Sequence, residues 1–240
     1  MVKRLLKLFD LTKVPPLAVD VYSKVSRAAN GDFHSHVADD VAEESKKMVG
    51  HRILDIGTGP GYLSLNIARR TPEKIHLVGI DISEQMINQA RANAKQMGIP
   101  PQRVYFSVAN AERLPLYEEE FGFIVSTEAL HQVKDPVKML NQIYRALKPG
   151  GKAWIYDTTS DLSNTHLDMH LDMMKRRLLA GKMNRTTISW VTLLRKREIL
   201  FDSYTMTEIL EIVKKSKFKE CDLHRDGIWV KIVLRKPKAE

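Results

Sequence analysis

Short apolar runs rich in β-branched residues recur along the middle of the chain, at 52–56, 75–80, 103–108, 123–126 and 152–156. Helical patterns lie between them. Ser83 is a predicted helix N-cap, and the pair Asp135-Pro136 predicts another helix start, with helix ends near Gly98 and at the KPGG sequence of 148–151. Strands that are apolar on both faces and alternate with helices are typical of a parallel sheet covered on both sides. An α/β fold is therefore predicted.

The end of the chain departs from this alternation. Thr205 and Glu208 form a predicted capping box ahead of an apolar helix. Two further segments, FKECDLH at 218–224 and IWVKIVLR at 228–235, are joined across Asp226-Gly227, which is a strong hairpin signal. We therefore expect an antiparallel pair of strands after the five parallel ones.

Two segments lie outside this predicted core. Residues 1–50 are predicted to be helical, with a break at Pro15-Pro16 and a loop at Asn30-Gly31. Residues 158–204 form an insertion that is rich in methionine and carries one apolar helical stripe: Leu167, Leu171, Met174 and Leu178. We expect these two segments to form a helical lid over a core of residues 51–157, with residues 205–240 completing the sheet.

Charge and composition limit the partners. The net charge of +9 in 240 residues is spread over the whole length without a dense basic stripe, so nucleic acid is an unlikely partner. The single cysteine, Cys221, excludes an internal disulfide and fits a reducing, cytoplasmic setting. No apolar stretch approaches the ~20 residues of a membrane span, and the first residues are interpreted as an amphipathic helix. His166 and His170 are interpreted as a solvated helix edge, and no metal site is expected.

The sequence ILDIGTGPGYL at 53–63 contains the most informative loop. An apolar run ends on Asp55, and Gly57, Gly59 and Gly61 then allow a sharp turn and the close approach of a ligand. A dinucleotide-binding loop would place its third glycine at position 62, which is tyrosine. A pyrophosphate would also lie unfavourably beside Asp55, whereas the sulfonium and ammonium groups of S-adenosylmethionine would suit a carboxylate.

Asp81 ends the second apolar run, 20 residues after the last glycine of the loop. This position suits the two hydroxyls of a ribose in either nucleotide, so Asp81 alone does not separate the two ligands. Ile82 and Met86 follow it and could form an apolar face for an adenine ring.

Four stretches in this order resemble class I S-adenosylmethionine-dependent methyltransferases, nearest to the small-molecule enzymes of ubiquinone and menaquinone biosynthesis: DIGTGPG, VGIDISEQMI, NAERLP and LKPGGKAWIYD. The resemblance implies a Rossmann-like seven-stranded sheet of order 3-2-1-4-5-7-6 with strand 7 antiparallel. It also implies a set of cofactor-binding residues: Asp55, Gly57, Thr58, Gly59, Gly61, Asp81, Ile82, Met86, Asn110, Ala111, Glu112 and Thr127. Asn110 stands where the family usually has aspartate, and Gly122 stands where it often has aspartate.

The acceptor is less constrained by the sequence. The segment STEA at 126–129 lacks the motif that nucleobase amino methyltransferases carry there, and Cys221 is misplaced for cytosine methylation. His131 is the first candidate for a general base, with a structural histidine as the alternative, and Tyr22 and Tyr156 are weaker candidates.

We expect methyl transfer from S-adenosyl-L-methionine to a small, partly apolar acceptor, with S-adenosyl-L-homocysteine as the product. A non-catalytic binding protein and an RNA methyltransferase remain the alternatives, and the sequence leaves the oligomeric state open.

Overall fold

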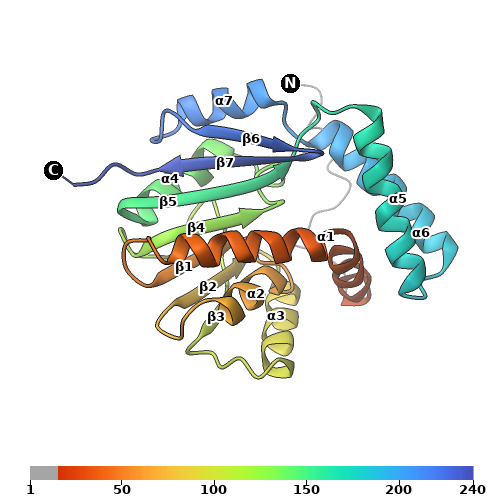
Figure 1. The fold of residues 1–240 in the computed structure, drawn as a ribbon, viewed down its shortest axis with the longest axis horizontal. Helices are drawn as coiled ribbons and strands as arrows, with labels where there is room; N and C mark the ends of the chain where they lie inside the picture. Colours follow the sequence, from red (N-terminus) through yellow and green to blue (C-terminus); the bar gives the residue numbers. More distant parts are fainter. Residues whose placement is uncertain (1–15, 240) are drawn as a thin grey trace.

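The structure is a computed structural model that describes the backbone of residues 16–239 and the side chains of residue 25 and residues 30–239. Its centre is a seven-stranded sheet of order β3-β2-β1-β4-β5-β7-β6 (Figure 1). The strands are β1 Arg52–Ile56, β2 His76–Asp81, β3 Val104–Val108, β4 Phe121–Thr127, β5 Leu147–Thr158, β6 Asp222–Asp226 and β7 Trp229–Arg235. β7 runs antiparallel to both of its neighbours, β5 and β6, so the predicted strand order and the hairpin are confirmed.

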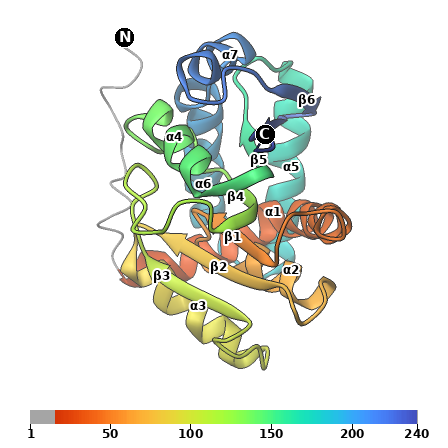
Figure 2. The ribbon, with the colours of Figure 1, turned by 90° about the vertical axis from the view of Figure 1, so that its left-hand side faces the viewer.

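Helices cover both faces of the sheet (Figure 2). The helices α1 Pro16–Ser45, α2 Tyr62–Arg70 and α3 Glu84–Gln96 pack on one face, and α4 Pro136–Ala146 and α7 Met206–Lys215 pack on the other. Three helix starts form as predicted. The side chains of Ser83 and Asp135 accept from the backbone of their own helices, and Thr205 and Glu208 form the capping box.

Helix α1 corrects one prediction, because it continues without a break through Asn30-Gly31. A glycine inside a helix costs about 1 kcal/mol relative to alanine. Val37, Ala38 and Val41, later in the same helix, are buried in the core cluster on one face of the sheet. This burial offsets the cost of the glycine. The KPGG turn likewise lies inside the first residues of β5 rather than before it.

The insertion forms α5 Asn164–Ala180, α6 Arg185–Arg197 and the short π-helix η3 Glu198–Asp202. The predicted apolar stripe of α5 is buried in a cluster that also includes Ile228. His170 is buried too, which corrects its interpretation as part of a solvated edge. The α5–α6 hairpin lies beyond the end of the sheet toward which the parallel strands point (Figure 1).

Gly122 lies in β4, where the backbone of another segment touches it. A Cβ atom at this position would lie 1.7 Å from the carbonyl oxygen of Val49. This contact gives a physical reason for glycine at this position.

We expect Gly122→Ala to destabilise the protein by about 3 kcal/mol, because a fixed backbone atom must move to admit the methyl group. Gly31→Ala is the matched control. It lies in α1 with open space around it, and it should be neutral or stabilising. Urea unfolding of both variants measures the difference, and equal stability of the two would contradict the steric explanation.

No helix within residues 16–239 is both long and apolar enough to cross a bilayer.

Candidate functional site

The glycine loop follows β1 at the point where the strand order reverses between β1 and β4, which is where α/β sheets bind ligands. Gly57, Gly59 and Gly61 all have positive φ, between 52° and 81°. A Cβ atom at Gly57 would lie 2.7 Å from the methyl group of Ala129. The loop therefore needs glycine for backbone conformation at all three positions, and at Gly57 and Gly61 also for space.

Asp55 lies beneath this loop and is fully buried. Its Oδ2 accepts hydrogen bonds from the hydroxyls of Thr58 and Ser64, both at 2.7 Å, whereas its Oδ1 has no partner among the described residues. Burial, only partly offset by these bonds, raises the pKa of Asp55 to about 6. The structure thus places Asp55 as a support of the loop, with one buried oxygen atom left over.

Asp81 connects the loop to the start of α3. Its Oδ2 accepts from the backbone N–H of Gly59 and its Oδ1 from that of Ser83, both at 2.9 Å. Burial raises the pKa of Asp81 above its ordinary value, and these backbone bonds oppose the shift.

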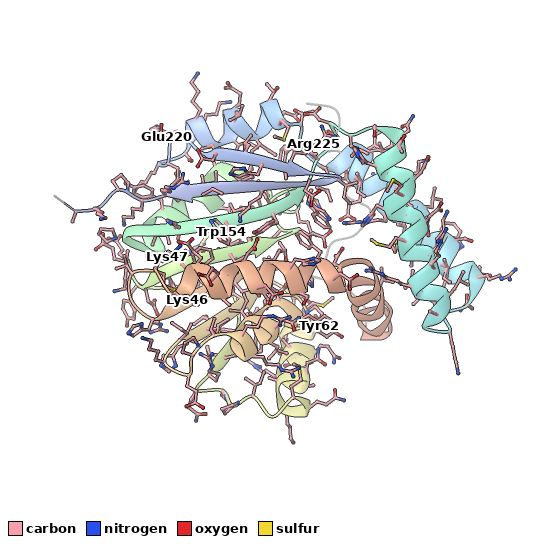
Figure 3. The ribbon with its side chains drawn as sticks, in the orientation of Figure 1. Lys46, Lys47, Tyr62, Trp154, Glu220 and Arg225 are labelled. Atoms are coloured by element: carbon pink, nitrogen blue, oxygen red, sulfur yellow. The ribbon has the colours of Figure 1, made fainter. Side chains whose placement is uncertain are left out.

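A cavity of about 50 Å³ lies over the loop. Its lining combines the loop with residues of α1, α3 and the segment after β4: His34, Gly57, Thr58, Gly59, Pro60, Tyr62, Leu63, Asp81, Ser83, Met86, Thr127, Glu128 and Gln132. Tyr62, at the start of α2, lies at the same end of the sheet as the α5–α6 hairpin (Figure 3). Six of the predicted cofactor residues are therefore brought together here: Gly57, Thr58, Gly59, Asp81, Met86 and Thr127.

Other predicted cofactor residues lie beside the cavity and not in its lining. Ile82 and Val108, at the ends of β2 and β3, are 44% and 45% exposed, which leaves two apolar side chains uncovered next to Asp81. Asn110 accepts from the backbone N–H of Glu112, 2.8 Å away.

Ala111 is half-buried against the core, and Gly61 lies over the ring of Phe106 without lining the cavity. The Glu112 carboxylate accepts from the backbone N–H groups of Lys134 and Asp135, so it fixes the loop before α4.

His131 is buried between two carboxylates. Its Nδ1 lies 2.6 Å from Asp157 Oδ1, and its Nε2 lies 3.0 Å from Glu198 Oε1. Burial acts to lower the pKa of His131, but the two carboxylates outweigh it and raise that pKa to about 10. An imidazolium with both nitrogen atoms bonded is not the neutral imidazole that the general-base hypothesis for His131 requires. This geometry favours the structural alternative.

Glu128 extends the His131 group of charges toward the cavity. Its carboxylate binds Arg195 of α6 and the side-chain amide of Asn30 in α1, and Arg195 also binds Glu198 at 2.8 Å. Glu128 has a φ of 56°, an uncommon backbone conformation for a residue other than glycine. We call Asn30, Glu128, His131, Asp157, Arg195 and Glu198 the charged cluster. It joins both segments of the predicted lid to the core.

Of the two tyrosine candidates, Tyr156 does not line the cavity. The side chain of Tyr22 lies outside the described residues. Tyr156 is buried against Phe33, with ring centroids 5.6 Å apart, and burial raises the pKa of its phenol well above the ordinary value. Among the described residues no group of histidine, cysteine and acidic side chains is arranged to hold a metal ion.

Seven lining residues were not identified as functional from the sequence, and His34 and Glu128 are two of them. His34 is 7% exposed, and its Nδ1 has no partner among the described residues. Glu128 is part of the STEA segment that follows β4 at the strand-order reversal, so its position was a usable signal. Nothing in the sequence places the helical residue His34 over a loop 25 residues away.

A family model described as a methyltransferase domain matches residues 47–218. The ubiquinone/menaquinone biosynthesis C-methyltransferase UbiE of Vibrio vulnificus strain YJ016 is 36% identical over 108 residues, which are 45% of this chain and 41% of that protein. UbiE of Geobacter sulfurreducens is 35% identical over 115 residues, which cover 48% and 44% of the two chains. The match thus spans less than half the length of these relatives.

Solved structures show the same fold. The structure of a SAM-dependent methyltransferase from Aquifex aeolicus has a TM-score of 0.64 at 18% identity and covers 93% of this chain and 99% of that one. The plantazolicin methyltransferase BpumL, solved with SAH, has a TM-score of 0.70 at 15% identity and covers 91% and 90%. With the family match over most of the chain, this chain belongs to the methyltransferase-domain family of class I S-adenosylmethionine-dependent methyltransferases.

Proposed function

We propose that this protein transfers a methyl group from S-adenosylmethionine to a small, partly apolar acceptor. The observation that carries the proposal is the cavity at the β1–β4 reversal, where the glycine loop, Asp81 and Met86 meet residues of both α1 and the segment after β4. A methyl donor and an acceptor can then be held side by side, because one wall belongs to the nucleotide-binding loop and the other to helix α1.

The residues present fit the cofactor. The Oδ1 of Asp55, unpaired among the described residues, is an acceptor beneath the loop, Asp81 at the end of β2 can accept from ribose hydroxyls, and the uncovered side chains of Ile82 and Val108 suit the face of an adenine ring. Asn110 offers an amide next to them. S-adenosylmethionine, when bound, supplies an activated methyl group on a sulfonium, so the protein has to align an acceptor and exclude water.

The described histidine and tyrosine candidates offer little base catalysis. His131 is charged and Tyr156 keeps its proton, which leaves the neutral side chain of His34 as the uncharged imidazole of the cavity. Burial lowers the pKa of His34 to about 4, so it is a weak base and a better hydrogen-bond partner. An acceptor that is already nucleophilic suits this cavity better than one that must first lose a proton.

We infer that α1 and residues 158–204 act as a lid. The cavity of about 50 Å³ is well below the roughly 300–1,000 Å³ of typical ligand pockets. Helix α1 contributes His34 to its lining, and Arg195 of α6 holds Glu128 at its edge. These contacts support a closed arrangement that must open to admit ligands.

A calorimetric titration with S-adenosylhomocysteine, with NAD run beside it, tests the ligand class. We expect micromolar binding of the first and no binding of the second, because no lysine or arginine lines the described cavity to neutralise a pyrophosphate. Binding of NAD alone would contradict the proposal. If the protein binds the cofactor but shows no turnover across a panel of small acceptors, that result would favour a non-catalytic role.

A further inference from the structure

The cavity lining attracts positive charge. Among the described residues that form it, the charged groups are Asp81 and Glu128, and none is lysine or arginine. His34 adds a buried, unpartnered Nδ1, and burial keeps its pKa near 4, so this ring is neutral at physiological pH. The cavity therefore presents two carboxylates and one uncharged imidazole to whatever it holds.

The positive and negative charges of the charged cluster do not cancel. It contains three carboxylates, Glu128, Asp157 and Glu198, against two cations, His131 and Arg195. One negative charge is left over, and Glu128 is the cluster carboxylate that lines the cavity. Its side chain is only 13% exposed, so solvent screens this charge poorly.

The two forms of the cofactor differ by one charge. S-adenosylmethionine carries a sulfonium, whereas loss of the methyl group leaves a neutral thioether, and the amino and carboxylate groups of both cancel. We propose that Glu128 is a cation-binding residue that makes the site prefer the charged methyl donor over its neutral product. This inference rests on the proposed function and adds to it a means of releasing the product.

The position of Glu128 is fixed by the lid. Asn30 of α1 and Arg195 of α6 bind its two carboxylate oxygens from separate segments. Arg195 is in turn held by Glu198, 2.8 Å away. Because the carboxylate is held on both oxygens, it cannot turn away from the cavity while the lid is docked, and its charge faces the ligand whenever the lid is closed over it.

Protonation gives an independent measure of the same interaction. Burial raises the pKa of Glu128 above its ordinary value, although Arg195 and His131 oppose the shift and Glu198 and Asp157 add to it. A bound cation favours the ionised form and lowers that pKa, so binding of S-adenosylmethionine should release protons. Its affinity should then rise with pH up to the raised pKa of the free protein. The neutral product should show less of this dependence.

We would titrate the wild-type protein with S-adenosylmethionine and with S-adenosylhomocysteine by calorimetry, in two buffers of different ionisation enthalpy and at several pH values. We expect the donor to bind about tenfold more tightly than the product or better. We also expect the ratio of donor affinity to product affinity to grow with pH. Binding of the donor should release more protons than binding of the product. Equal affinities with equal proton release would overturn the inference while leaving the proposed function standing. No binding of either ligand would refute the proposed function as well.

The variant Glu128→Gln keeps the shape and a hydrogen-bond acceptor but removes the charge. We expect it to weaken binding of the donor about tenfold and to leave binding of the product within about threefold. Any proton release that remains in the variant would come from Asp81 and Asp55, the other two carboxylates at the site whose pKa values are raised by burial.

Glu198→Gln is the matched control, because it removes one charge from the same cluster at a residue that does not line the cavity. It should change the ratio of the two affinities less than Glu128→Gln does. Equal losses of both ligands in Glu128→Gln would assign the residue to structure alone. Should that variant unfold, the difference in proton release between donor and product in the wild type still decides the question, because the two ligands share every group except the methylated sulfur.

Discussion

Replacing Asp81 with alanine is expected to lower cofactor affinity by about 100-fold or more while the fold remains intact. In the free protein the Asp81 carboxylate holds the backbone N–H groups of Gly59 and Ser83, both at 2.9 Å. Hydrogen bonds to a charged group contribute about 1.5–3 kcal/mol each, and 1.4 kcal/mol corresponds to tenfold in affinity. The variant therefore loses both the ribose partner and the clamp on the glycine loop.

Calorimetry with S-adenosylhomocysteine measures this loss, and circular dichroism checks the fold. Glu84→Ala is a suitable control, since it removes an exposed acid of α3 three residues further along. An affinity that stays unchanged in Asp81→Ala would refute the assignment of this residue to the ribose. Asp81→Asn should lie between the two, because the amide keeps one acceptor oxygen.

Removing the imidazole in His131→Ala is expected to destabilise the folded protein by about 3–5 kcal/mol, because it leaves Asp157 and Glu198 without their shared cation. The pKa of His131 in the folded protein is about 10, compared with 6.5 ordinarily. A raised pKa means that the stabilisation is fully present below about pH 6.5 and is lost as the pH rises through about 10.

Urea unfolding of the wild type and His131→Ala at pH 6.5 and at pH 9.5 measures this effect. The difference in the free energy of unfolding between the two proteins should be smaller at the higher pH. His36→Ala, an exposed histidine of α1, serves as the control and should change little. A constant gap across this range would contradict the charged state of His131. We also expect turnover to fall in His131→Ala through loss of lid docking, with affinity for S-adenosylhomocysteine retained.

The sheet and its caps were predictable because they depend on local sequence. Apolar runs predicted the parallel strands, and Asp226-Gly227 predicted the hairpin that joins β6 to β7, which lies beside β5. The glycine loop and Asp81 were found from their spacing, because adjacent parallel strands end at one edge of the sheet.

The charged cluster could not be predicted in the same way. Asn30 and Glu128 are 98 residues apart, and Glu128 and Arg195 are 67 apart. An arginine in an insertion and an acid after a strand carry no sequence pattern that pairs them. His131 was therefore interpreted as a possible base, since its two carboxylate neighbours lie in distant segments. The loop expected at Asn30-Gly31 was wrong for a related reason, because tertiary packing outweighed the local preference of glycine.

The position of β7 has a consequence for synthesis on the ribosome. This strand lies between β5 and β6, so the order of the strands in space differs from their order in the chain. While the chain emerges, the whole hydrogen-bonding edge of β5 stays open until residues 229–235 have been made. An open edge of this length is a site for pairing with other chains. The nascent protein therefore has a long interval in which a chaperone would protect it, and the sheet closes only with its last strand.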